Sequence, residues 1–416
     1  MVMLDRRMLM IGAAALPTAA AAARFTPAWQ ADEAEWQAIA AQYDVTREVI
    51  QLENGNWGMM PLPVMRAYEA AVERLNRDSS YYLRRGYAAD ARAVHERMAS
   101  ALGVPPDEIA FTRNASEALK ALIGGYNRLQ PGDAILYADL DYVSMQACMK
   151  NLALRHRAQL VTIDLPEPAT KQGLIDAYAA AFEANPRLKL ALLTHLSHRT
   201  GLVLPVREIA ALARARGIDT IVDAAHSWCQ IDFSLPDLDC DFVGINGHKW
   251  LAAPLGVGVI HIRKSALDRI DIDGANEPDA TGVDARVHVG TADVAALLAV
   301  PAALDFHQSI GGARKAARLR ALRDRWVKPL RGVPGIEILT PDDPTLYGAI
   351  TSFRFAGQTS TAQNVALARR LLDEHGIFTV DRDGVAKGSC VRVTPSLFNS
   401  FSDMDALASA LKAMRA

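Results

Sequence analysis

The stretch Thr220-Ile221-Val222-Asp223-Ala224-Ala225-His226 says most about how this chain folds. It is a short apolar run that ends in an aspartate, with a histidine three residues further on. A run of this length and composition predicts a buried β-strand. In open α/β sheets, ligands bind outside the carboxyl ends of the strands, which is where Asp223 would lie. The stretch therefore predicts a strand of a parallel sheet with a binding site at its end.

Similar runs alternate with helical patterns on both sides of this stretch. Further strands are predicted at 108–112, 134–137, 188–194, 241–245 and 258–262. Helical spacing of apolar residues occurs at 31–52, 63–77, 90–102, 116–128, 144–154 and 206–216. Strands that alternate with helices predict an α/β domain whose mainly parallel sheet is flanked by helices on both faces.

The pattern changes after residue 303. A long helix at 314–330 is followed by an apolar segment at 336–339, a strand at 349–355, a helix at 362–375 and a strand at 391–394. This order is typical of a smaller α+β domain. We expect an N-terminal segment at 29–62, a large domain at 63–303 and a small C-terminal domain at 304–416.

The first 28 residues have the features of a signal peptide. Arg6 and Arg7 precede the small and apolar run 8–23, whose alanines offer cleavage sites. The paired arginines resemble a twin-arginine signal, which predicts a periplasmic or secreted protein. A cytoplasmic protein with a frayed N-terminal helix is the alternative. The run is too rich in alanine and too short to predict a transmembrane helix, so we expect no membrane association after cleavage.

Composition narrows the class of protein. The 416 residues carry 45 basic and 47 acidic side chains, so the net charge is −2 and a nucleic-acid backbone is not an expected partner. Four cysteines without a C-x-x-C pair predict no structural zinc site. The spacings of His195, His198 and His226 do not form a convincing zinc set either, and we expect no metal.

Three further segments carry residues suited to chemistry, each with an ordinary alternative. Thr112-Arg113-Asn114-Ala115-Ser116-Glu117 marks the start of a helix, which predicts a phosphate site or only a helix cap. Lys249, in Asn246-Gly247-His248-Lys249-Trp250, follows a predicted strand and is either a Schiff-base lysine or a solvated one. Arg392 lies within an apolar strand, where an arginine binds a carboxylate or forms a structural ion pair.

These segments occur together with Leu52-Glu53-Asn54-Gly55-Asn56-Trp57-Gly58, Asp139-Leu140-Asp141-Tyr142, Thr194-His195-Leu196-Ser197 and Gly290-Thr291-Ala292-Asp293. In this order, the set resembles the class V aminotransferase group of fold-type I pyridoxal 5′-phosphate (PLP) enzymes, and within it the isopenicillin N epimerase-like branch. The resemblance extends from about residue 52 to 402. It implies the PLP fold type I, with a large domain and a smaller C-terminal domain, and PLP as the cofactor.

The resemblance also implies roles for individual residues. Lys249 would bind PLP covalently and act as acid and base, Asp223 would pair with the pyridine nitrogen, and His226 would contact the phenolic oxygen. The other implied cofactor contacts are Ala115, Ser116, Tyr142, Ser197, Asn246, His248 and Thr291. Among these, Tyr142 would stack on the ring, while Ala115, Ser116 and His248 would hold the phosphate.

Some implied positions depart from the family or reach beyond one chain. Asn246 lies where relatives often have a phosphate-binding serine, and Ser197 and His198 lie near a position that is often asparagine. Thr291 would reach the phosphate of a neighbouring subunit, which implies a homodimer with a shared active site. The resemblance implies two substrate contacts. Arg392 would bind the α-carboxylate, and Asn56 would also contact the substrate.

The reaction is left open among several types. We expect an enzyme that acts on the α-amino group of an amino acid or peptide-like derivative, as an aminotransferase or an epimerase. A C–S lyase acting on a cysteine conjugate is the second hypothesis, and a degenerate binding protein without catalysis is the third. Persulfide chemistry is disfavoured because the loop 381–388 has no cysteine and Cys390 lies only two residues before Arg392.

Overall fold

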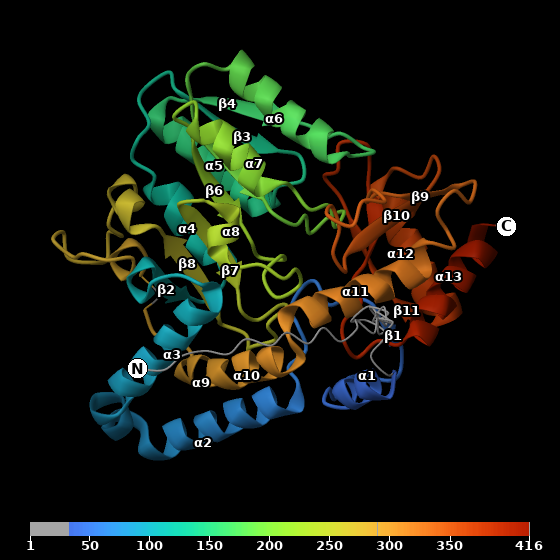
Figure 1. Ribbon diagram of the computed structural model, residues 1–416, viewed down its shortest axis with the longest axis horizontal. Coiled ribbons are helices and arrows are strands. Elements are labelled where there is room, and N and C mark those ends of the chain that lie inside the picture. The colour runs from blue at the N-terminus through green and yellow to red at the C-terminus, as the bar shows by residue number, and fades with distance from the viewer. Residues whose placement is uncertain (1–32, 289, 416) are drawn as a thin grey trace, which may run out of the picture.

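The computed structural model describes residues 33–288 and 290–415. Its large domain is built on a sheet with the strand order β2-β8-β7-β6-β5-β3-β4 (Figure 1). The strands are β2 (Ile109–Thr112), β3 (Ala134–Ala138), β4 (Gln159–Ile163), β5 (Leu188–Thr194), β6 (Asp219–Asp223), β7 (Phe242–Asn246) and β8 (Gly258–Ile262). Only β8 runs against its neighbours among these strands. The expected mainly parallel sheet is therefore confirmed.

Helices cover both faces of this sheet. Along β5, Leu190 and Leu192 pack with α4 (Ala115–Gly125) and α5 (Val143–His156), whereas Ala191 and Leu193 face the core with α6 (Lys171–Ala184) and α7 (Val206–Arg214). This alternation follows from the two-residue period of a strand. Because both faces are buried, the strand is mostly apolar, which is why it can be recognised in the sequence.

The second unit contains an antiparallel sheet with the order β12-β13-β10-β9. Its strands are β9 (Ile336–Ile338), β10 (Thr351–Phe355), β12 (Val380–Arg382) and β13 (Cys390–Val393). Three helices pack with it, namely α11 (Gly312–Val327), α12 (Thr361–His375) and α13 (Phe401–Arg415). The ribbon view shows this unit beside the large sheet, with α11 leading into it (Figure 1).

The N-terminal segment joins the second unit. We expected helical structure across 31–52, but α1 spans only Glu33–Ala40 and an extended segment follows. β1 (Ile50–Gln51) pairs in parallel with β11 (Ile377–Phe378), and Leu52 is buried among the apolar side chains of this unit. Pairing with a strand far along the chain overrides the local helical pattern here. The chain then returns to the large domain through α2 (Leu62–Arg85) and α3 (Tyr87–Leu102).

Other elements were absent from our expectations. β4 lies at the sheet edge and is largely exposed or half-buried, so it lacks an apolar run. The helices α6 and α13 were also missed, as were the short α8 (Leu235–Leu238), α9 (Val294–Leu298) and α10 (Val300–Ile310). The expected signal peptide at 1–28 lies outside the described residues.

No helix of the described residues has, by itself, both the length and the apolar composition needed to cross a membrane. One pair, Val294–Ile310 with Gly312–Val327, meets both criteria together but is bent by 74°.

Candidate active site

A cavity of about 590 Å³ opens where the carboxyl ends of β6 and β7 meet the start of α4 and residues of the second unit. Its wall contains most of the predicted site: Asn56, Ala115, Ser116, Tyr142, Asp223, His226, Asn246, His248, Lys249 and Arg392. These residues are far apart in the sequence. The parallel sheet brings them together, because strands running in one direction place their carboxyl ends at the same edge.

Asp223 is the last residue of β6 and lies buried at this edge. Its Oδ1 accepts a hydrogen bond of 2.9 Å from the N–H of Ala225. Burial raises the pKa of Asp223, while the N–H of Ala225 and the charge of Lys249 act in the opposite direction. Asp223 is therefore a buried carboxyl group at the cavity wall, where a nearby positive charge would favour its ionised form.

Lys249 lies on the same wall, and its Nζ is 2.8 Å from Nε2 of His226. Burial lowers the pKa of Lys249 to about 8, and the negative charge of Asp223 opposes this shift. Burial, followed by the charge of Lys249, lowers the pKa of His226 well below its usual value. The imidazole is therefore neutral near pH 7, and the amine is much more easily deprotonated than an exposed lysine.

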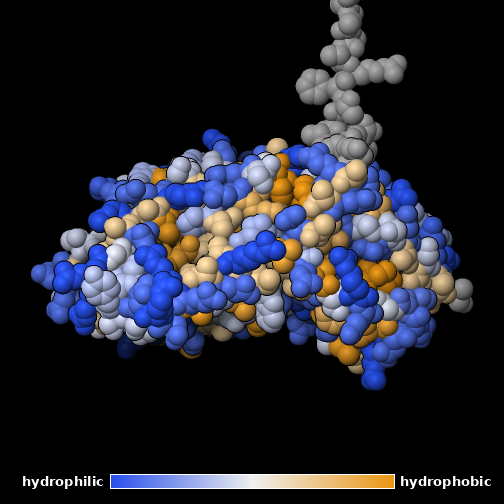
Figure 2. Space-filling model, turned by 90° about the horizontal axis from the view of Figure 1, so that it is seen from below, coloured by the Kyte–Doolittle hydropathy of each residue, from blue (hydrophilic) through white to orange (hydrophobic). Residues whose placement is uncertain are grey.

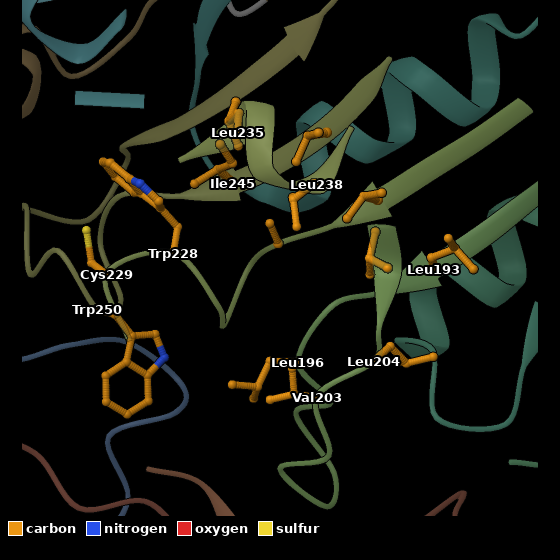
Figure 3. Close-up of a cluster of buried hydrophobic side chains, with 14 of the residues drawn as sticks. Leu193, Leu196, Val203, Leu204, Trp228, Cys229, Leu235, Leu238, Ile245 and Trp250 are labelled. Atoms are coloured by element: carbon orange, nitrogen blue, oxygen red, sulfur yellow. The ribbon is translucent and has the colours of Figure 1, made fainter. Parts of the chain in front are cut away.

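The backbone around Lys249 is held tightly. The N–H of Gly58 donates to the carbonyl of His248 at 2.8 Å, and a Cβ at Gly58 would lie 1.9 Å from the carbonyl oxygen of Lys249. On the other side, Trp250 and Trp228 are buried in the apolar cluster shown in Figure 3. The segments that carry Lys249 and His226 are thus both anchored in one core.

The start of α4 borders the cavity. Asn114 caps the helix by accepting from the N–H of Glu117 at 2.9 Å. The N–H of Ala115 donates to Oδ1 of Asn246 at 2.8 Å. The resemblance implied that Ala115 would hold the phosphate, but this N–H is already paired with a side chain. For the N–H of Ser116, the described part of the chain offers no protein partner. Ser116 is therefore better placed than Ala115 to bind a phosphate oxygen.

His248 borders the same end of the cavity. Its Nδ1 lies 3.1 Å from the carbonyl oxygen of Val257, which can only accept, so Nδ1 carries the proton. Burial lowers the pKa of His248 to about 4. The ring is therefore neutral, with Nε2 as its remaining polar atom.

Arg392 lies on β13 at the opposite end of the cavity and is fully buried. Its Nη1 donates to the carbonyl of His198 at 2.7 Å, and its Nη2 donates to Oε1 of Glu53 at 2.5 Å. Burial lowers the pKa of Arg392 to about 10, an effect that Glu53 opposes. Arg392 thus lines the cavity and forms an ion pair with Glu53, and its binding of a substrate carboxylate stays a prediction.

The wall also includes side chains that were not given a role from the sequence, among them Arg382 and His198. Arg382 on β12 lines the cavity, and its Nη2 lies 3.5 Å from the same Oε1 of Glu53. His198 lies with its ring 5.2 Å from that of Tyr142, edge to face, and 6.3 Å from that of His226. Burial and the charge of Arg392 lower the pKa of His198 well below its usual value. The sequence signal for Arg382 is only its proximity to the predicted carboxylate-binding strand.

Two predicted residues lie outside this wall. Ser197 is fully buried, and its Oγ accepts from the N–H groups of Arg199 and Thr200 at 3.2 and 3.3 Å. Its hydroxyl therefore closes a turn instead of facing the cavity. Thr291 is exposed in the loop before α9, and its contact with a neighbouring subunit stays a prediction. Among the described residues, no group of three or more histidine, cysteine or acidic side chains could hold a metal ion.

Known proteins of similar sequence show the family of this chain. The family model "Aminotransferase class-V" matches residues 59–406. The chain belongs to the class V aminotransferase family. Its curated relatives include isopenicillin N epimerases from Streptomyces clavuligerus, 30% identical across 92% of this chain and 98% of the relative, and from Amycolatopsis lactamdurans, 32% identical across 91% and 98%.

Solved structures agree on the fold. An apo cysteine desulfurase from Thermococcus onnurineus is 20% identical, with a TM-score of 0.78 over 91% of this chain and 98% of that one. A structure of a C-DES mutant, in which glycine is covalently linked to the PLP cofactor, has a TM-score of 0.75 and 22% identity over 89% and 98%. The resemblance and the fold class expected from the sequence are therefore confirmed.

PLP is the cofactor of this class V enzyme, and the side chains of the cavity fit it. The buried amine of Lys249 would hold the cofactor covalently, the buried carboxylate of Asp223 would accept from the pyridine nitrogen, and the start of α4 would bind the phosphate. His226 adds a ring whose Nδ1 is buried and has no partner in the described structure. When bound, PLP supplies an electron sink that stabilises negative charge at the α-carbon of an amino substrate.

Proposed function

We propose that this class V enzyme inverts the configuration at the α-carbon of an amino acid or peptide-like derivative by removing and returning a proton. The observation that carries this proposal is the contact between Lys249 and His226, because it places a readily deprotonated amine beside a neutral imidazole in the cavity. The two isopenicillin N epimerases, aligned over nearly their whole length, support the same reaction type.

Inversion requires proton carriers that reach the α-carbon from two sides. Lys249 is one carrier, since its neutral form accepts a proton near pH 8. The wall also holds Tyr142 and His198, whose rings are 5.2 Å apart and which supply a phenol and a neutral imidazole. We assign the second proton transfer to this pair. Arg392 would orient the substrate through its α-carboxylate.

The cysteines argue against persulfide chemistry. All four lie in the described structure, and none of them lines the cavity. Burial raises the pKa of Cys390 to about 11, and its thiol lies against the backbone carbonyls of Arg199 and Arg382. A thiol that is protonated and enclosed in this way is a poor nucleophile.

Product analysis tests the proposal. The PLP-loaded enzyme is incubated with pooled L-amino acids and peptide-like amino acid derivatives, with and without a keto acid, and the products are separated by chiral chromatography. Epimerisation predicts the D-configured product without a keto acid. A new keto acid would instead show transamination, and pyruvate with a released thiol would show a C–S lyase. No product from any pool, with PLP bound, would favour a binding protein.

We also propose that the enzyme acts as a homodimer with a shared active site. α2 exposes Val72, Tyr81 and Leu83, and apolar patches lie among hydrophilic side chains on the face shown in Figure 2. Sedimentation should give twice the chain mass. Thr291→Asp should weaken PLP binding if Thr291 approaches the partner's phosphate, and an unchanged affinity would remove Thr291 from the site.

Finally, we propose export through the signal peptide at 1–28. The support is the basic pair at Arg6 and Arg7 followed by a small, apolar run. N-terminal sequencing of protein from cell fractions tests it. A periplasmic or secreted form that begins near residue 29 is expected, and a cytoplasmic form that still begins at Met1 would overturn it.

A further inference from the structure

Three charged side chains meet at the carboxylate end of the cavity. Oε1 of Glu53 lies 2.5 Å from Nη2 of Arg392 and 3.5 Å from Nη2 of Arg382. Glu53 and Arg392 are almost fully buried, whereas the side chain of Arg382 is 26% exposed. Both arginines line the cavity. One carboxylate oxygen is therefore shared unequally by two guanidinium groups, with the stronger contact to the more buried one.

The charges of this cluster do not balance. Glu53 supplies one negative charge against the two positive charges of Arg382 and Arg392. Arg382 is partly exposed and therefore partly hydrated, and one further carboxylate would balance the charge of the cluster. Two buried polar atoms also lack partners in the described structure, Oε2 of Glu53 and Nε of Arg392. The cluster thus has unused hydrogen-bonding capacity in addition to its unmatched charge.

The backbone beside the cluster limits how it can rearrange. A Cβ at Gly55 would lie 2.5 Å from Nη2 of Arg392, so the chain runs directly against this guanidinium group. Nη1 of Arg392 is bound to the carbonyl of His198. Arg382 is less constrained, because it is partly exposed and its Nη1 donates to the carbonyl of Asp381 beside it, at 2.8 Å. Of the two guanidinium groups, that of Arg382 is therefore the less constrained, and Oε2 of Glu53 has no partner in the described structure to hold it.

We propose that Glu53 is a resident carboxylate that occupies Arg392 until a substrate carboxylate arrives and then pairs with Arg382. The substrate carboxylate and Glu53 then match the two arginines one to one. The subsite consequently selects substrates that present a single carboxylate next to the reacting carbon, and it disfavours a second carboxylate close by. This inference rests on the proposed function only in requiring a substrate with an α-carboxylate.

Two aminooxy compounds that react with the bound cofactor isolate the carboxylate contribution. Aminooxyacetate carries one carboxylate, and O-methylhydroxylamine carries none. The ratio of their apparent affinities for the PLP-loaded enzyme, read from its visible spectrum at equilibrium, measures carboxylate binding without catalysis. Glu53→Gln should raise the preference for aminooxyacetate about fivefold, because a competing carboxylate is lost. Arg382→Gln should lower it by a similar factor, because Glu53 then stays on Arg392.

The opposite signs distinguish this proposal from a structural role. If Glu53 only holds Arg392 in place, Glu53→Gln would lower the preference, and that result would overturn the proposal. An unchanged ratio in Arg382→Gln would also overturn it. Glu53→Asp should restore the ratio toward that of the unchanged enzyme. Glu167→Gln, which removes the carboxylate beside Arg354, is the matched control for a lost ion pair and should leave the ratio unchanged.

A cofactor-free measurement separates this inference from the proposed function. The thermal midpoint of the apo protein is followed in propionate and in succinate. Propionate should raise the thermal midpoint of Glu53→Gln more than that of the unchanged protein. Succinate should raise the midpoint more than propionate does only in that variant. These outcomes do not depend on which reaction the enzyme catalyses. If Glu53→Gln fails to fold, Arg382→Gln alone still tests the proposal, since it must weaken the effect of propionate.

Discussion

The amine of Lys249 and the imidazole of His226 form a contact of 2.8 Å between Nζ and Nε2, and both groups are buried. Burial lowers the pKa of both side chains, so the pair carries less charge than its composition suggests. Such a pair gives a nucleophilic amine near neutral pH and keeps a neutral imidazole beside it.

Lys249→Ala should abolish covalent attachment of PLP and lower turnover by at least about a thousandfold, because the reactive amine of the cavity wall is removed. Borohydride reduction followed by peptide mass analysis should find the cofactor on Lys249 in the unchanged enzyme. Lys315→Ala is the control, since Lys315 is also buried but donates to the carbonyl of Trp250. Label on a peptide other than that of Lys249 would contradict the assignment.

The rate of PLP attachment to the apo enzyme should depend on pH with a midpoint near 8. Burial lowers the pKa of Lys249 from 10.5 to about 8, so the reactive neutral amine increases as pH rises to this value and is nearly complete above it. Stopped-flow absorbance should show about a tenfold gain per pH unit below the midpoint and a plateau above. Asp223→Asn should move the midpoint lower, because the charge of Asp223 opposes the shift. A rate still rising above about pH 10, the range of an ordinary lysine, would be incompatible with this account.

Gly55→Ala should weaken carboxylate binding while the protein remains folded. The added methyl group would lie 2.5 Å from Nη2 of Arg392, which is fixed by bonds to Glu53 and His198. The preference for aminooxyacetate over O-methylhydroxylamine should fall severalfold. Gly124→Ala on α4 is the control, since no atom lies within 4 Å of its added Cβ. It should stabilise the helix by about 0.5–1 kcal/mol and leave binding unchanged.

Asn246→Asp should lower the affinity for PLP by about tenfold or more. Asn246 accepts the N–H of Ala115 at the start of α4, so a negative charge at this position would repel the phosphate. Titration of the apo enzyme with PLP measures the effect. Asn151→Asp introduces the same charge on the exposed side of α5 and should leave the affinity for PLP unchanged. Equal affinity in both variants would move the phosphate away from the start of α4.

Asp141→Asn should change stability in a way that depends on pH. Burial raises the pKa of Asp141 from 3.8 to about 7, so the folded protein favours its protonated form. The contribution of Asp141 is fully present below about pH 4 and is lost as pH rises to about 7. The variant should therefore gain stability relative to the unchanged protein over this range, as measured by urea unfolding. The exposed Asp305→Asn should show no such gain, and a flat difference for Asp141→Asn would disprove the assignment.

The parts of the fold that are buried on both sides were predictable from the sequence. β5 is mostly apolar because helices cover both of its faces, and β6 carries the apolar pair Ile221-Val222 before Asp223, so both strands could be recognised. The edge strand β4 is largely exposed or half-buried and has no such run. β1 is fixed by pairing Ile50 with Ile377, a contact between distant segments that a local pattern does not contain.

The candidate site divides in the same way. Asp223 and Lys249 could be placed because Asp223 ends a buried strand, Lys249 follows one, and the parallel sheet brings such ends together. The ion pair of Glu53 and Arg392 joins residues 339 positions apart, so its geometry depends on the complete fold. Ser197 lies next to the cavity-lining His198 in sequence, but its hydroxyl turns toward the N–H groups of its own loop. Side-chain direction within a loop is set by such local bonds, which a residue type alone does not specify.

Exchange of the α-proton with solvent tests the central claim most directly. The PLP-loaded enzyme and its Lys249→Ala variant are incubated in deuterium oxide with candidate amino acids, and the recovered substrate is analysed by mass spectrometry and chiral chromatography. Inversion at the α-carbon predicts deuterium at this carbon and formation of the opposite enantiomer without a keto acid, both lost in Lys249→Ala. A loaded enzyme that converts or binds a substrate but leaves its α-hydrogen and configuration unchanged would contradict it.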